Sequence, residues 1–186
     1  MRLISVNVGR PKVLADYRGR TVLSAIAKEP VSGPVAVKKL NIEGDSQADL
    51  SVHGGEEKAV YVYPSEHYQY WKERFPERVL PWGSFGENLT TEGLMENEIR
   101  LEDRLVIGTA QFEVTQPRFP CFKLGLKFNT QKFVKAFLNS DRTGFYLKVL
   151  KEGRLRAGDV IVLEKTRNSS ETITSIVRSV NESETD

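Results

Sequence analysis

The chain has 186 residues, of which 39% are hydrophobic and 28% are charged, which suits one globular domain with a sizeable core rather than a disordered or fibrous chain. The net charge is only +2, yet it is +6 over residues 1–40, −9 over 41–103, +7 over 104–166 and −2 over the last twenty. These sign changes argue against a nucleic-acid-coating protein and leave room for a local basic pocket that binds a small anion.

Short β segments bounded by glycine or proline dominate the first half of the chain. Alternating apolar residues predict strands at 3–8, 21–27, 35–40 and 59–63. A helix is expected to begin at Pro64, because proline fits the first helical turn. Its apolar face is indicated by the helical spacing of Tyr68, Trp71 and Phe75.

The second half continues this pattern with a hairpin, a helix and two more strands. We expect a hairpin of 105–108 and 111–115 around Gly108, and a helix over 130–138 capped by Asn129. Strands are expected at 144–150 and 159–163. Together these elements predict a mainly β fold with a few helices, arranged as a closed or nearly closed β-barrel. We assign residues 1–165 to this domain and 166–186 to a polar tail, with one short helix or strand near 173–180.

The N-terminus and the cysteine count bear on the location of the protein. The segment from Met1 to Gly9 turns polar before a long apolar run develops, so we expect neither a signal peptide nor a membrane anchor. A single cysteine cannot form an internal disulfide and would be a liability in an oxidising compartment. The expected location is therefore the cytoplasm.

A glycine-rich cluster follows the acidic stretch at 44–49. His53, Gly54 and Gly55 precede Lys58, and two glycines after a histidine let the backbone approach a ligand and cradle an anion. A plain glycine-rich loop with a solvated histidine explains the same residues. A second cluster at 85–93 contains Asn88, whose amide suits the edge of a heterocycle, although turn chemistry explains it equally well.

The most informative cluster surrounds the only cysteine. Pro117 and Pro120 fix the backbone beside Cys121, and Arg118 and Lys123 lie close in sequence. A thiolate near cations has a lowered pKa and can act as a nucleophile or a soft-metal ligand. A buried, inert cysteine is the alternative, and the residues alone leave both open. The segment at 142–146 either adds a cation and a hydroxyl to this site or is a loop that enters a strand.

Several familiar sites can be set aside. One cysteine with His53 and His67 cannot supply a Cys/His structural zinc site. The sequence contains neither a dinucleotide-binding glycine fingerprint nor a phosphate-binding Gly-Lys-Ser/Thr loop. A cysteine protease built on Cys121 and His53 stays open as an alternative, but the sequence shows no nucleophile elbow and no local protease signature.

In order along the chain, these clusters resemble the MOSC domain, which is named for the C-terminal domain of molybdenum cofactor sulfurase, and its small stand-alone bacterial members above all. The resemblance covers roughly residues 2 to 165. The matching stretches are Gly44-Asp45 with Gln47-Ala48-Asp49, His53-Gly54-Gly55 through Lys58 to Tyr61, Tyr63-Pro64 with Glu66-His67-Tyr68 and Trp71, Phe85 to Leu89, Pro117-Arg118 with Pro120 to Leu124, Thr143 to Tyr146 and Ala157-Gly158-Asp159.

The resemblance implies a barrel-like fold and the molybdenum cofactor (molybdopterin), with Cys121 ligating molybdenum through sulfur or carrying a sulfur atom. Related members reduce N-hydroxylated compounds such as hydroxylaminopurines. A thiolate suits a soft metal, while the cofactor supplies the redox chemistry. The residues expected to bind the cofactor are Arg118, Lys58, Lys123, Asn88, Gly54 and Gly55.

The resemblance also sets the expected partners and the alternatives. We expect His53 to lie near the substrate as a proton donor. A separate protein is expected to donate electrons, because no iron–sulfur or flavin module is evident in the sequence. The alternative is a non-catalytic carrier that holds a persulfide or the cofactor on Cys121. Pyridoxal phosphate binding is a weaker alternative, since no lysine stands in a recognisable Schiff-base context.

Overall fold

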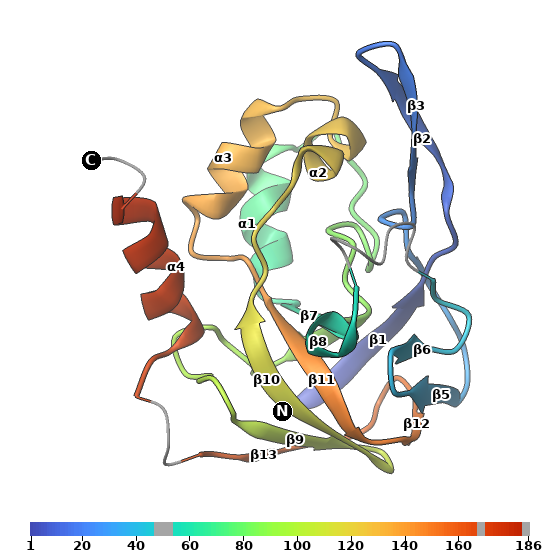
Figure 1. The fold of residues 1–186 in the computed structure, drawn as a ribbon, viewed down its shortest axis with the longest axis vertical. Coiled ribbons are helices and arrows are strands. Elements are labelled where there is room, and N and C mark those ends of the chain that lie inside the picture. Colours follow the sequence, from blue (N-terminus) through green and yellow to red (C-terminus); the bar gives the residue numbers. More distant parts are fainter. Residues whose placement is uncertain (47–53, 167–169, 184–186) are drawn as a thin grey trace.

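The computed structural model describes residues 1–46, 54–166 and 170–183, which form an eight-stranded sheet, two smaller sheets and a set of helices (Figure 1). The large sheet has the order β13-β9-β10-β11-β7-β8-β1-β4. Its strands are β1 (Arg2–Val8), β4 (Glu29–Pro30), β7 (Val60–Pro64), β8 (Leu89–Glu92), β9 (Arg104–Ile107), β10 (Ala110–Pro117), β11 (Phe145–Lys151) and β13 (Ile161–Glu164). The smaller sheets are the β2 (Lys12–Tyr17) and β3 (Arg20–Ser24) hairpin, and β12 (Gly153–Leu155) with β5 (Val35–Lys38) and β6 (Asn41–Ile42).

Most neighbouring strands of the large sheet pair antiparallel, and β7 with β8 is the parallel exception. A parallel pair needs a long crossover, and here the crossover contains α1 (His67–Arg74) and the loop that leads to β8. The expected mainly β fold with few helices is therefore confirmed. The expected hairpin around Gly108 is present as β9 and β10.

The expected closed barrel is wrong. Within the described residues the large sheet has two free ends, at β13 and β4. Only an isolated bridge between Arg2 and Val160 and a few backbone hydrogen bonds join β1 to the start of β13. Because β4 has two residues and β13 has four, these strands are too short to build the ladder that closure requires.

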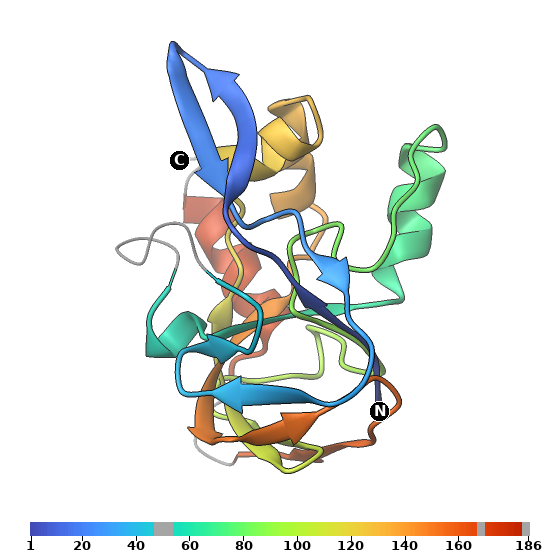
Figure 2. The same ribbon diagram turned by 90° about the vertical axis from the view of Figure 1, so that its right-hand side faces the viewer.

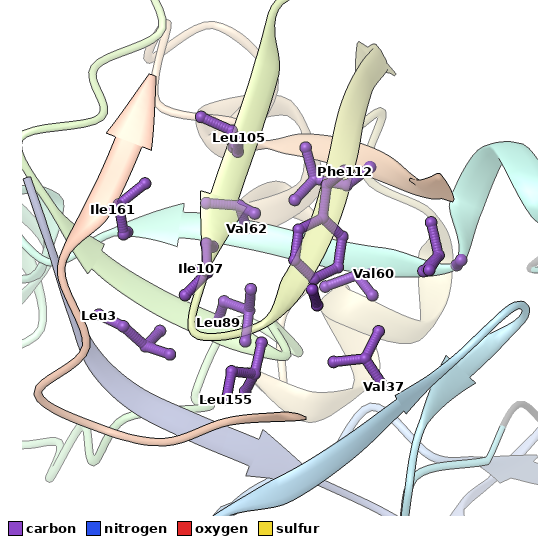
Figure 3. Packing of buried hydrophobic residues seen from close by; sticks show 14 of the residues in the cluster. Leu3, Val37, Val60, Val62, Leu89, Leu105, Ile107, Phe112, Leu155 and Ile161 are labelled. Atoms are coloured by element: carbon purple, nitrogen blue, oxygen red, sulfur yellow. The ribbon is translucent and has the colours of Figure 1, made fainter. Parts of the chain in front are cut away.

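The main core lies between strands of the large sheet and the smaller β12-β5-β6 sheet (Figure 3). Along β10, the buried Ala110, Phe112 and Val114 alternate with residues that face outward, as the period-two geometry of a strand requires. Leu3 of β1, Val62 of β7 and Ile161 of β13 close the same cluster. This apolar interior fixes the ends of β7, β10 and β11, from which the candidate site is built.

A second, aromatic core joins the sheet to the three helices α1, α2 (Phe122–Lys127) and α3 (Lys132–Leu138). Trp71 of α1 stacks on Phe137 of α3 with ring centroids 5.5 Å apart. Its indole Nε1 also donates a 2.7 Å hydrogen bond to the hydroxyl of Tyr63 on β7. These contacts, together with Leu124 of α2 in the same cluster, fix the positions of the three helices relative to β7.

Two helix starts differ from the sequence expectation. Pro64 does not open α1, because it is the last residue of strand β7 and the helix begins at His67. Asn129 does not cap α3, because it adopts a left-handed backbone with a φ of 51°, and the helix begins at Lys132 after Gln131. The segment expected as a short helix or strand near 173–180 forms α4 (Ile173–Ser183), with Ile173 and Val177 buried. No helix in the described parts of the chain has the length and apolar character needed to cross a membrane.

The β2–β3 hairpin projects away from the body of the molecule in both views (Figures 1 and 2). Near its tip, the ring of Tyr17 stacks on Phe122 at the start of α2, with centroids 5.7 Å apart and an interplanar angle of 24°. The hairpin therefore contacts the helix that follows Cys121.

Candidate functional site

A cavity of about 110 Å³ lies where the segment after β3, strands β7 and β11, and the β10–α2 turn meet. Cations, amides and hydroxyls from distant parts of the sequence line it. The lining residues are Ser24, Ala25, Ile26, Lys28, Asp45, Lys58, Tyr61, Gly86, Asn88, Arg118, Phe119, Cys121, Lys123 and Tyr146. Four cationic side chains and one acid are in this set, so the cavity is suited to an anion.

Cys121 immediately precedes α2 with an extended backbone, after the turn that leaves β10. Pro117 and Pro120 restrict the backbone conformation of this turn, because each proline ring fixes the φ angle of its own residue. The side chain is partly exposed, so a ligand in the cavity can reach the sulfur atom. Among the described residues, no three His, Cys, Asp or Glu side chains come together as a metal cluster.

Arg118 is a buried cation on the wall of the cavity, with 5% of the residue exposed. Its guanidinium carbon lies 5.2 Å from the ring centre of Tyr61 and 5.1 Å from that of Phe137, close enough for cation–π attraction. Its Nη1 atom is buried without a hydrogen-bond partner among the described residues. An unpaired buried donor is unfavourable, so an anion in the cavity would stabilise this arginine.

The neighbours of Arg118 keep its charge in place. Burial lowers the pKa of Arg118, but Tyr61, Tyr146 and Cys121 raise it, and the net direction is upward. Burial in turn raises the pKa of Tyr146, against the lowering effect of Arg118. The cavity thus presents a permanent cation beside a neutral phenol and the thiol.

Lys28 and Asp45 form a buried ion pair at the cavity, with side chains 8% and 2% exposed. Oδ1 of Asp45 also accepts a 2.8 Å hydrogen bond from the amide of Gly9, and Oδ2 accepts one of 2.8 Å from Nδ2 of Asn88. The side-chain carbonyl of Asn88 accepts the amide of Tyr61 at 3.1 Å. This network fixes the orientation of Asn88 and joins five chain segments at the cavity wall.

Most of the site residues expected from the sequence lie at this one cavity. Arg118, Asn88, Lys58, Lys123 and Cys121 all line it. Lys58 comes from a short 3-10 helix, η1 (Glu56–Lys58).

The glycine-rich cluster is placed less directly. Gly55 precedes η1 with a φ of 89°, and neither Gly54 nor Gly55 lines the cavity. His53 lies outside the described residues, so its expected place near a substrate stays a prediction.

Sequence reasoning missed Lys28, Tyr61 and Tyr146 as members of the site. Lys28 follows the apolar run Ala25-Ile26-Ala27, and a lysine at the end of such a run is easily taken for a solvated strand end. Tyr146 was noted only as a hydroxyl within the segment at 142–146. The burial of Lys28 against Asp45 depends on contacts between segments far apart in sequence, which local patterns do not report.

Behind Lys28, the ammonium of Lys127 donates 3.1 Å hydrogen bonds to the backbone carbonyls of Ile26 and Gly83. Burial lowers the pKa of Lys127 to about 8, with further lowering by Lys28 and Arg118 and an opposing effect of Glu87. Between this pKa and the ordinary value of 10.5, the unfolded chain binds the proton and the folded chain does not. Stability due to this group therefore rises as pH increases.

We expect Lys127→Met to remove this rise. Urea unfolding across the window from pH about 8 to 10.5 should show the wild-type free energy of unfolding gaining up to about 3 kcal/mol relative to the variant. The comparison with the variant removes the contributions of other titrating groups, which both proteins share. Parallel curves for the two proteins would show that Lys127 has an ordinary pKa.

Comparisons with known proteins give a consistent result. The MOSC domain family model matches residues 49–162. The Bacillus subtilis protein YflK is 44% identical over 156 residues, covering 84% of this chain and 70% of that protein. A Gibberella moniliformis protein named a reductase is 35% identical over 164 residues, covering 87% of this chain and 29% of its own length.

A solved structure supports the same conclusion. The crystal structure of YiiM from Geobacillus stearothermophilus superposes with a TM-score of 0.80 and 38% identity, covering all of this chain and 86% of that one. The family match extends over more than half of the chain and includes Lys58, Asn88, Arg118 and Cys121 at the cavity. This chain belongs to the MOSC domain family, whose members are associated with the molybdenum cofactor.

Proposed function

We propose that this protein binds the molybdenum cofactor in the cavity beside Cys121 and reduces N-hydroxylated compounds such as hydroxylaminopurines. One observation carries the proposal: the buried, unpartnered Nη1 of Arg118 lies in the same cavity as the partly exposed thiol of Cys121. A cation that lacks an anion next to a soft-metal ligand matches a cofactor that has both an anionic phosphate and a metal. The family and the relative named a reductase support it.

Each cavity residue has a distinct part in this proposal. Cys121 ligates the metal as a thiolate, and Arg118 binds the phosphate with Lys58 and Lys123 nearby. Asn88 is held by Asp45 and Tyr61, so it can read the edge of the pterin without reorganising. When bound, the cofactor supplies the two-electron redox chemistry.

The overall reaction consumes two electrons and two protons. An N–OH bond breaks, the nitrogen is left with a new N–H bond, and the oxygen leaves as water. We propose that His53 donates one of the protons, because imidazole titrates near neutral pH. We also propose that a separate electron-donor protein supplies the electrons.

The first experiment measures molybdenum and pterin in the protein produced in a host that makes the cofactor. The expected result is about one of each per chain, with reduction of 6-hydroxylaminopurine by the loaded protein when a chemical reductant is supplied. The same protein from a host unable to make the cofactor serves as the control and should be inactive.

Two other outcomes would count against the proposal. Absence of molybdenum and pterin from the protein of the competent host would contradict the cofactor site. A persulfide on Cys121 in the intact mass, together with no N–O reduction, would favour the sulfur-carrier alternative instead.

A further inference from the structure

A second cavity, of about 400 Å³, adjoins the candidate site at Lys28. Lys28 lines both cavities, and none of the other lining residues is shared. The second cavity is built from the segment after β3, the loop after α1 and the end of α2. Its cations are Lys28, Arg78 and Lys127, and its walls include Leu80, Pro81 and Phe128.

The cations of this cavity come from three separate parts of the chain. Arg78 uses Nη2 to donate a 2.9 Å hydrogen bond to the carbonyl of Phe128. Its Nε is buried without a hydrogen-bond partner among the described residues, and its ion pair with the more exposed Glu77 is long, at 3.6 Å. The guanidinium is thus anchored at one end and has an unsatisfied donor at another.

Cationic side chains outnumber acidic ones on the wall of this cavity, although Lys28 is paired with Asp45 behind it. Among the described residues that line the cavity, Glu29 is the only acid, and its exposed carboxylate pairs with Lys12 at 3.5 Å. Lys127 has two carbonyl acceptors for its three hydrogens. Burial lowers its pKa, Glu87 opposes this change, and Lys28 and Arg118 lower the pKa further.

We propose that this second cavity is an anion-binding site for the phosphate or carboxylate group of a small organic molecule. Arg78 and Lys127 bind the anionic group, and Leu80, Pro81 and Phe128 contact the apolar part of the molecule. A guanidinium with an unsatisfied donor and an ammonium on the wall of one cavity are well suited to a phosphate. The site does not require the cofactor, but Lys28 joins the two cavities, so a ligand bound here lies next to the proposed cofactor site.

Phenyl phosphate is the probe that tests this site, because it combines an anionic group with an apolar body. Nitrogen-15 spectra of the arginine Nε–H groups follow the titration at individual residues. We expect a saturable shift of the Arg78 signal, weaker binding of inorganic phosphate, and no shift with phenol. Arg78→Gln should bind phenyl phosphate about tenfold more weakly, as the loss of a charge-assisted hydrogen bond predicts.

Arg74→Gln is the matched control. Arg74 is a cation of α1 whose guanidinium lies over the ring of Tyr70, and it does not line the cavity, so its replacement should leave binding unchanged. Lys127→Gln provides a second test if Arg78→Gln folds poorly, and we expect a similar loss. Equal affinity in wild type, Arg78→Gln and Lys127→Gln, or no saturable shift of Arg78, would overturn the proposal.

Two further measurements separate the possible sources of the anion and the two proposals. If the anionic group belongs to the substrate, a hydroxylaminopurine nucleoside monophosphate should have a lower KM than the free base, and Arg78→Gln should cancel the difference. If it belongs to a separate ligand, the KM values should be equal while phenyl phosphate still binds. The molybdenum content of Arg78→Gln should stay at the wild-type level, so failure of this site and failure of the cofactor site are distinguishable.

Discussion

Replacing Cys121 by serine should reduce N–O reductase activity of the loaded protein to background while leaving the fold intact. Serine has nearly the same size, but its hydroxyl is a hard donor that stays protonated near neutral pH, whereas a thiolate is a soft ligand suited to molybdenum. Cys121 is partly exposed and lies outside both hydrophobic clusters. The free energy of unfolding should therefore change by less than about 1 kcal/mol.

The measurement combines the rate of 6-hydroxylaminopurine reduction, the molybdenum per chain and a urea unfolding curve. Cys121→Ala should behave like the serine variant, because neither residue can ligate the metal through sulfur. A serine variant that keeps full activity would contradict the role of the thiol. If the alanine or serine variant no longer folded, the result would show that Cys121 is needed for the structure.

Replacing Glu87 by leucine should destabilise the protein by about 3 to 5 kcal/mol. The residue is fully buried. Its carboxylate accepts hydrogen bonds from the hydroxyls of Tyr68 and Thr90 and from the amides of Gly83 and Phe85. Leucine has a similar size but accepts none of them, so four buried donors lose their partner. Because Asn88 follows directly, the cavity wall should also lose its order.

Glu87→Gln is the matched comparison. Its Oε1 can keep the bonds that one carboxylate oxygen accepts, while its amide nitrogen faces the amide of Phe85 as donor against donor. We expect a loss of roughly 1 to 3 kcal/mol. Burial raises the pKa of Glu87, so its contribution to stability is fully present below the unfolded-state pKa and falls as pH rises through the folded-state pKa.

The glutamine side chain does not titrate, so the glutamine variant should lack this fall. Urea unfolding of wild type and both variants at several pH values checks both expectations. If leucine and glutamine were equally well tolerated, the carboxylate would have no part in holding the loop between Gly83 and Asn88.

Local sequence signals were enough for much of the fold. The spacing of Tyr68, Trp71 and Phe75 predicted a helix after strand β7, and α1 is found there. Pro64 misplaced its start, because this proline ends the strand and does not enter the first helical turn. The cap at Asn129 was misplaced, because a left-handed asparagine and a helical cap share the same residue preference. Closure of the barrel was also misjudged, since strand count does not report how long the terminal strands are.

Part of the candidate site was also predictable from local sequence, and part of it was not. Arg118, Lys123 and Cys121 could be found because they lie within six residues of each other beside two prolines. Lys28 could not, because its burial depends on Asp45 and on the close approach of Gly83. A Cβ at Gly83 would lie 2.7 Å from the carbonyl oxygen of Lys28, and the φ of Gly83 is +88°. Such contacts exist only after distant segments have packed together.

The pairing of β1 with β8 restricts when the chain can fold as it leaves the ribosome. Arg2 pairs with Glu92, ninety positions later. Strand β1 therefore cannot pair with β8 until about half of the chain has been synthesised. Cys121 and β11 emerge later still, and β11 must pair with β7 before the sheet is continuous. Assembly of the cavity is thus expected only late in synthesis, and shorter nascent chains present an unpaired apolar strand edge that chaperones or aggregation would capture.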